Sequence, residues 1–189
     1  SPRPESWLKD METFRRSGRD SVIFKDLRSA AESGWDFSSR WFVDTFSIET
    51  IRTTNIIPVD LNCLIYHLEK TLEHARRLNN DQEKAAEMQN LAEIRKTYIL
   101  KYCWNEEKGF FYDYNFHEKK QSMRSSLAGI YPLFFNIANR NQAQKTLNKI
   151  REEFLYDGGL VTTNYKTSEQ WDSPNGWAPL QWIGYKACK

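Results

Sequence analysis

Apolar side chains recur every three or four residues through the middle of the chain, and this spacing constrains the fold more than any other feature. The first run is Leu61, Leu64, Ile65, Leu68, Leu72 and Ala75, which share one face of an α-helix. Asp60 is a candidate N-cap for that helix. Asn79-Asn80-Asp81 interrupts the run, and a second amphipathic helix is expected from about 82 to 103. Its expected inward residues are Met88, Leu91, Ala92, Ile99 and Tyr102. The two helices predict an antiparallel hairpin.

Helices and loops alternate on both sides of this hairpin. Helices are expected over about 7–16, 20–31, 127–138 and 143–154 and after Pro174, with a kink or a fresh start at Pro132. Short extended segments are expected at 108–114 and 160–163, with a turn at 157–159. Strands and helices do not alternate as a parallel sheet requires. Paired helices with aromatic loops gathered on one side favour an all-α fold of the toroid type.

Composition and charge exclude several classes of protein. A chain of 189 residues suffices for one domain with a sizeable core. The net charge is +2 and the two signs are well mixed, which argues against a nucleic-acid partner. No apolar run reaches the length of a membrane span. Cys63, Cys103 and Cys188 are odd in number and far apart, so we expect free thiols rather than a disulfide framework or a metal site.

The segment Glu32-Ser33-Gly34-Trp35-Asp36-Phe37-Ser38-Ser39-Arg40-Trp41 combines an acid with flanking aromatic residues. A carboxyl group in apolar surroundings holds its proton to higher pH, so Asp36 is a candidate proton donor. The alternative is a loop aspartate that caps a helix, with Trp35 and Trp41 as ordinary core residues. Arg40 either orients Asp36 or forms a structural ion pair. Both questions stay open at this stage.

A second such segment, 169–182, places three tryptophans among amides and carboxylates. Flat indoles suit the C–H face of a pyranose, and amides and carboxylates suit its hydroxyl groups. The alternative is a rigid turn that leads into a helix. That alternative is the better interpretation for Pro174, Pro179 and Trp182. It is the weaker one for Gln170, Trp171 and Asp172, where polar and aromatic residues alternate.

Other polar residues are weaker candidates. His67 and His74 lie seven residues apart without a carboxylate at ligand spacing, so no metal site is predicted. Asp44, Glu49 and Asp60 are candidate second carboxylates. Asp60 is better explained as a helix cap, and Glu49 as a charge on a helix surface.

Five segments of the chain resemble, in order, the α,α-trehalase family of inverting glycoside hydrolases. Gln170-Trp171-Asp172-Ser173-Pro174-Asn175-Gly176-Trp177-Ala178-Pro179 resembles one of the family's diagnostic motifs, and 31–41 resembles its stretch with the catalytic acid. Arg3-Pro4-Glu5-Ser6, Ile51-Arg52-Thr53-Thr54 and 57–62 are also similar to the family. The resemblance covers the whole chain. It implies an all-α fold that is part of an (α/α)6 toroid with short extended aromatic loops.

The resemblance also implies a function and a site. It implies hydrolysis of α,α-trehalose to two glucose molecules with inversion, without a cofactor. Asp36 takes the place of the catalytic acid. Arg3, Pro4, Glu5 and the Gly34 backbone would bind sugar hydroxyls, and Trp171 and Asp172 would line the pocket. Inverting glycosidases hold acid and base roughly 6.5–9.5 Å apart, with room for a water molecule between them.

Two elements of the family pattern do not occur in this sequence. One is a Gly-rich motif upstream of Arg-Pro-Glu, and the other is the base, a glutamate in a Glu-Lys-Tyr context downstream of Gln-Trp-Asp. We therefore expect residues 1–189 to form a single partial catalytic domain, inactive alone, of a monomeric full-length enzyme. The opening Ser1-Pro2-Arg3-Pro4 has no signal-peptide character, and the compartment stays open. The alternatives are a non-catalytic sugar-binding polypeptide and a different toroid glycosidase.

Overall fold

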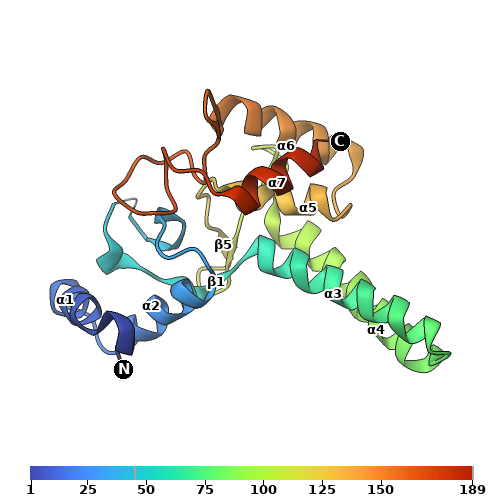
Figure 1. The fold of residues 1–189 in the computed structure, drawn as a ribbon, viewed down its shortest axis with the longest axis horizontal. Coiled ribbons are helices and arrows are strands. Elements are labelled where there is room, and N and C mark those ends of the chain that lie inside the picture. Colours follow the sequence, from blue (N-terminus) through green and yellow to red (C-terminus); the bar gives the residue numbers. More distant parts are fainter. Residues whose placement is uncertain (45, 189) are drawn as a thin grey trace.

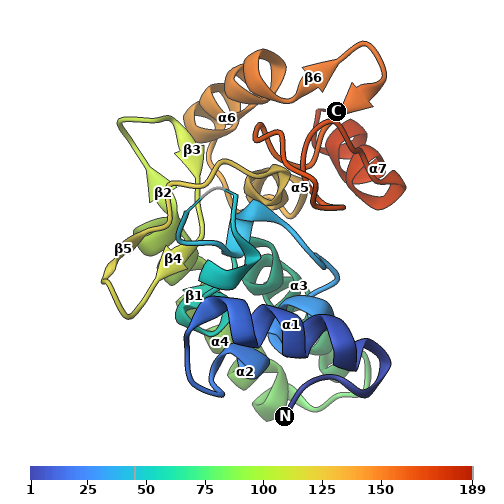
Figure 2. The same ribbon diagram turned by 90° about the vertical axis from the view of Figure 1, so that its left-hand side faces the viewer.

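The computed structural model describes residues 1–44 and 46–188, and helices dominate it. The helices are α1 (Trp7–Ser17), α2 (Ile23–Glu32), α3 (Val59–Leu78), α4 (Gln82–Tyr98), α5 (Tyr131–Phe134), α6 (Arg140–Glu153) and α7 (Ala178–Ala187). α4 continues as a wider π-helical segment over Ile99–Cys103. In Figure 2, α1 and α2 lie at the bottom of the molecule, and α5, α6 and α7 lie together toward the top.

The strands are all short and pair antiparallel. β1 (Ile56–Ile57), β4 (Tyr114–Asn115) and β5 (Lys120–Gln121) form one sheet in the order β1-β4-β5. β2 (Trp104–Asn105) pairs with β3 (Phe110–Phe111), and β6 (Leu155–Tyr156) pairs with β7 (Gly159–Leu160). The extended segment expected at 108–114 and the turn at 157–159 are therefore confirmed.

The central hairpin of α3 and α4 projects from the rest of the molecule (Figure 1). Asp60 does not cap α3, contrary to expectation, because the helix begins at Val59 and Asp60 lies in its first turn. The side chain that accepts the Val59 N–H belongs instead to Asp113, at 2.9 Å. Asp81 caps α4 by accepting the Lys84 N–H.

The apolar spacing predicted α3 correctly but not the face that packs. Leu61, Leu64 and Leu68 are 49%, 46% and 54% exposed. The face of α3 that meets α4 holds Glu69, whose carboxylate receives hydrogen bonds from Arg95 of α4. Small residues of α4, Ala85 and Ala92, are fully buried. The hairpin is thus joined by ion pairs and close packing, and its leucine stripe faces outward.

Pro132 reshapes the helix expected over 127–138. Residues Leu127–Ile130 form a 3₁₀ turn, and α5 starts afresh at Tyr131 with proline in its first turn, where a missing N–H costs nothing. After Pro174 the chain stays non-helical until Ala178, because Trp177 has an extended backbone. The core runs from α2 through Trp35 and Trp41 to β3 and α5–α7. It brings together loops that are more than a hundred residues apart in the sequence.

Candidate active site

Asp36 lies on the loop between α2 and Ser39, and it differs from the buried aspartates of the chain. Its side chain is half-buried. Among the described residues no hydrogen bond or ion pair reaches its carboxylate, whereas Asp10, Asp26 and Asp113 are buried and paired. A carboxyl group with no protein partner is free to exchange its proton with a ligand.

Trp35 and Trp41 anchor the two ends of this loop in the core. Both indoles are buried, and Trp41 Nε1 donates a hydrogen bond to the Trp35 carbonyl at 3.0 Å. The Arg40 guanidinium lies over both rings, 4.6 Å from the Trp35 centroid and 4.4 Å from that of Trp41. Such cation–π contacts are strongest where water is excluded.

Arg40 forms a buried ion-pair network and does not contact Asp36. Its Nε and Nη2 donate to Asp113, both at 2.7 Å. Its Nη1 and Nη2 donate to Asp60 at 2.8 and 2.7 Å. Of the two roles predicted for Arg40, the structure therefore supports the structural ion pair. Asp60, predicted as a cap, is one of its partners, and Asp113 is a partner that sequence reasoning missed.

This network fixes the charge states of its members. Burial opposes ionisation of Asp60, but the adjacent guanidinium outweighs it and lowers the pKa of that carboxyl. Burial likewise acts against the charged form of Arg40, yet Asp113 and Asp60 together raise its pKa. Nearby, burial and the charge of Asp60 raise the pKa of Tyr131 to about 12. All these groups keep their usual charge near neutral pH.

Asp172 is fully buried and holds the other side of the acid loop. Its Oδ1 accepts hydrogen bonds from the hydroxyls of Ser38, Ser39 and Thr163 at 2.8, 2.9 and 2.9 Å. Its Oδ2 accepts from the Ser39 N–H at 2.8 Å and from the Thr167 hydroxyl at 2.6 Å. These hydroxyl partners were not foreseen from the sequence, because they lie up to 134 residues away.

Trp171 lies beside the acid loop in a stack of indoles. Its ring is 5.0 Å from that of Trp35 and 4.7 Å from that of Trp177, with which it is nearly parallel. Its backbone N–H donates to the Phe37 carbonyl at 2.9 Å. Its Nε1 is buried and has no partner within the described part of the chain. The predicted pair Trp171 and Asp172 therefore does lie next to Asp36.

Arg3 also reaches this region. It is buried against α1, where its Nη2 donates to Asp10 at 2.7 Å, and its guanidinium lies 5.0 Å from the Phe37 ring centroid. Pro4, Glu5 and Gly34 are exposed. Gly34 has a φ of +79° and open space where a Cβ would lie, so its backbone is accessible to a ligand. Arg3 and Trp171 thus both contact Phe37, the residue after Asp36.

Glu169 adds a second carboxyl group to this region. It is half-buried, and burial raises its pKa, with further contributions from the negative charges of Asp172 and Glu49. Glu49, expected to be a charge on a helix surface, lies in a 3₁₀ turn and pairs with Arg16 at 2.8 Å. A half-buried glutamate of this kind is a recognisable site feature, although its neighbours were not predictable from the sequence.

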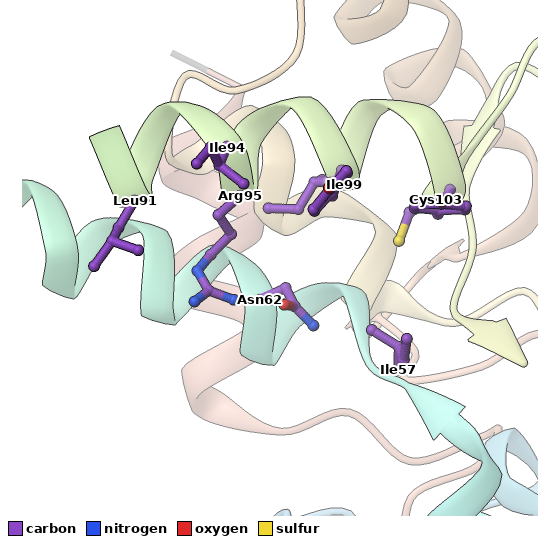
Figure 3. Close-up of a pocket in the computed structure, with 9 residues that line it drawn as sticks. Ile57, Asn62, Leu91, Ile94, Arg95, Ile99 and Cys103 are labelled. Atoms are coloured by element: carbon purple, nitrogen blue, oxygen red, sulfur yellow. Dashed lines mark hydrogen bonds between the residues drawn. The ribbon is translucent and has the colours of Figure 1, made fainter. Parts of the chain in front are cut away.

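A separate cleft of about 320 Å³ lies beside the α3–α4 hairpin (Figure 3). Ile57, Leu91, Ile94 and Ile99 line it, together with Asn62 and Arg95. Arg95 is already bound to Glu69 and Asn62. Because no carboxylate lines this cleft, it offers no acid for hydrolysis, and the Asp36 region remains the candidate active site.

Residues 1–44 and 46–188 contain no group of three or more His, Cys, Asp or Glu side chains placed to hold a metal ion. None of their helices combines the length and the apolar character that crossing a membrane requires.

Comparison with known proteins places the chain in context. The family model for trehalase matches residues 1–188. Periplasmic trehalases of Salmonella agona and Salmonella paratyphi C are each 44% identical over 185 residues, which is 97% of this chain and 32% of theirs. The chain thus spans about a third of the length of these relatives.

The fold is similar to that of solved glycoside hydrolases. Neutral trehalase from Saccharomyces cerevisiae matches with a TM-score of 0.74 and 25% identity over 93% of this chain and 34% of its own. A mannosylglycerate hydrolase from Thermus thermophilus matches 70% of this chain and 32% of its own, with a TM-score of 0.59 and 16% identity. The helical toroid architecture expected from the sequence is therefore confirmed.

Proposed function

The chain belongs to the trehalase family, and from this membership and the site geometry we propose that the full-length protein carrying it hydrolyses α,α-trehalose to two glucose molecules. The observation that carries the proposal is the Asp36 carboxyl group, half-buried and without a protein partner on a loop held at both ends. The 44% identity to periplasmic trehalases over this region supports the choice of substrate.

Asp36 acts as the general acid. Its proton passes to the glycosidic oxygen while the bond between that oxygen and the anomeric carbon breaks. A water molecule attacks the same carbon from the opposite face and loses its proton to a general base, so the configuration inverts. The family's Glu-Lys-Tyr context for the base occurs nowhere in residues 1–189. We assign the base to other residues of the full-length protein.

The surrounding residues bind and orient the disaccharide. Trp171, supported by the parallel Trp177 ring, provides a flat wall for a pyranose face. Arg3 is oriented by Asp10, which bonds its Nε and Nη2, and it donates to sugar hydroxyls. The exposed Glu5 and the Gly34 backbone accept from or donate to further hydroxyls, and Pro4 sets the backbone between Arg3 and Glu5. We propose a monomer as the active form.

The stereochemistry of the products tests this function. Inversion of α,α-trehalose releases one β-glucose from the attacked ring and one α-glucose from the leaving group. Proton NMR of the full-length protein with trehalose, recorded before mutarotation, should therefore show the two anomers in equal amounts. Release of α-glucose alone would indicate retention, and no glucose release would refute the function. Size-exclusion chromatography of the same sample tests the monomer.

A further inference from the structure

Asp172 joins two segments that are distant in the sequence, and its bonds concentrate on the residues that directly follow Asp36. Three of the five hydrogen bonds that its carboxylate accepts come from Ser38 and Ser39. The neighbouring Trp171 N–H binds the Phe37 carbonyl at 2.9 Å. The backbone or side chain of each residue from 37 to 39 is therefore tied to residues 171–172, while the Asp36 carboxylate itself stays unpaired.

The other partners of Asp172 fix its own position. Thr163 and Thr167 donate to Oδ1 and Oδ2 from the segment that precedes Gln170. Asp172 is 0% exposed, and both of its oxygens are occupied by protein donors. A buried carboxylate with all its acceptor sites used cannot also bind a sugar hydroxyl without losing a protein partner.

We propose that Asp172 is a positioning residue, which holds the loop after Asp36 so that the acid points at the glycosidic oxygen, and that it does not contact substrate. This inference rests on the proposed function, because it assigns Asp172 a role in the same reaction. It also replaces the expectation that Asp172 lines the sugar pocket. Displacing a catalytic group by about 1 Å costs roughly a hundredfold in rate.

Two substitutions of Asp172 should disturb its hydrogen bonds to different extents. Asparagine can keep its oxygen toward the Ser39 N–H and turn its NH₂ toward the hydroxyls, which accept as well as donate. Asp172→Asn therefore preserves most of the bonds but loses the charge. Asp172→Ala removes every acceptor and leaves the Ser39 N–H without a partner. The acid loop should thus move slightly in the first variant and more in the second.

The test compares two substrates in the full-length protein. Trehalose needs a proton on its leaving group, whereas α-D-glucosyl fluoride releases fluoride without one. If Asp172 acts through Asp36, kcat for trehalose falls about tenfold to a hundredfold in Asp172→Asn. It should fall further in Asp172→Ala, while KM and fluoride turnover change by less than about threefold. If Asp172→Ala does not fold, Thr167→Val removes one bond at the far side of the carboxylate and should give a smaller loss of the same kind.

Asp26→Asn is the matched control. Asp26 is also 0% exposed and accepts bonds from Arg19 and from the N–H and hydroxyl of Thr54, neither of which belongs to the acid loop. Its variant should lower stability without changing the ratio of trehalose to fluoride turnover. An unchanged ratio in Asp172→Asn, or a ratio equal to that of Asp26→Asn, overturns the inference.

Amide hydrogen exchange distinguishes a failure of the function from a failure of the inference. The Ser39 amide donates directly to Asp172, so its exchange should accelerate in Asp172→Asn and not in Asp26→Asn. Accelerated exchange in a protein that does not hydrolyse trehalose would refute the proposed function but leave the loop-holding role in place. Unchanged exchange in an active enzyme would overturn the inference alone.

Discussion

Replacing Arg40 by methionine tests whether the buried ion-pair network holds the site together. Arg40→Met keeps an unbranched apolar side chain between Trp35 and Trp41 but removes the guanidinium. The wild-type side chain is 0% exposed and donates four hydrogen bonds of 2.7–2.8 Å to Asp60 and Asp113. The variant leaves two buried carboxylates without their counter-ion.

The expected loss of stability is large. Breaking a buried pair by removing one partner costs roughly 3–5 kcal/mol. Asp60 and Asp113 retain backbone donors at Leu61 and Val59, so we expect a value near the middle of that range, about 4 kcal/mol. Urea unfolding of residues 1–189, followed by tryptophan fluorescence, measures this change in the free energy of unfolding.

The pH dependence of the loss gives a sharper signature. In the wild type the pKa of Asp60 is lowered, so its contribution to stability is present above the ordinary carboxyl pKa of about 3.9. It is lost only as the pH falls through the lower folded value. Without Arg40, burial raises that pKa instead, and the variant regains stability on protonation. The difference between wild type and variant should therefore shrink from pH 7 to pH 4.5.

Two further variants complete this experiment. Arg16→Met makes the same substitution at an arginine whose side chain is 66% exposed and paired with Glu49. Such a surface pair is worth less than about 1 kcal/mol. Adding Asp60→Asn and Asp113→Asn to Arg40→Met should recover part of the loss, because the stranded charges are gone. If Arg40→Met costs no more stability than Arg16→Met, or if its cost does not change with pH, the buried ion-pair network does not hold the site together.

Two other predictions follow from the described geometry. The folded-state pKa of Glu169 is raised, so ionisation of Glu169 costs stability as the pH rises through that value. Glu169→Gln should therefore raise Tm at pH 7 and change it little at pH 4. An equal change in Tm at both pH values would contradict this. The exposed leucine stripe of α3, formed by Leu61, Leu64 and Leu68, should bind a hydrophobic dye when residues 1–189 are studied alone. The double variant Leu64→Gln with Leu68→Gln should lower the dye fluorescence with little change in Tm. As a control, Leu127→Ala at a fully buried position should lower the free energy of unfolding by about 2–5 kcal/mol. If the double variant leaves the dye fluorescence unchanged, the leucine stripe is not the surface that binds the dye.

The sequence predicted helices better than it predicted what they pack against. The spacing from Leu61 to Ala75 located α3 correctly, because periodicity reports an amphipathic helix whatever covers it. It did not show that Glu69 and Arg95 would join α3 to α4 while the leucines faced outward. Which face is buried depends on other parts of the fold, and those lie outside a local pattern.

The same limit applies to the charged residues of the site. Arg40 looked equally able to orient Asp36 or to pair elsewhere, since its partner Asp113 lies 73 residues away. Asp60 matched a helix cap because it precedes the apolar run, yet its role is set by Arg40. The polar residues near Trp171 were recognised as hydroxyl-binding, and Asp172 does bind hydroxyls, but those of Ser38, Ser39, Thr163 and Thr167.

The turnover of Asp36→Asn in the full-length protein shows whether Asp36 is the proton donor. Asparagine has nearly the same shape as aspartate but carries no acidic proton, and general acid catalysis contributes roughly 10²–10⁴-fold to the rate. We predict that kcat for trehalose falls by about that factor, with KM nearly unchanged. A variant that hydrolyses trehalose at close to the wild-type rate would contradict the assignment of Asp36 as the proton donor.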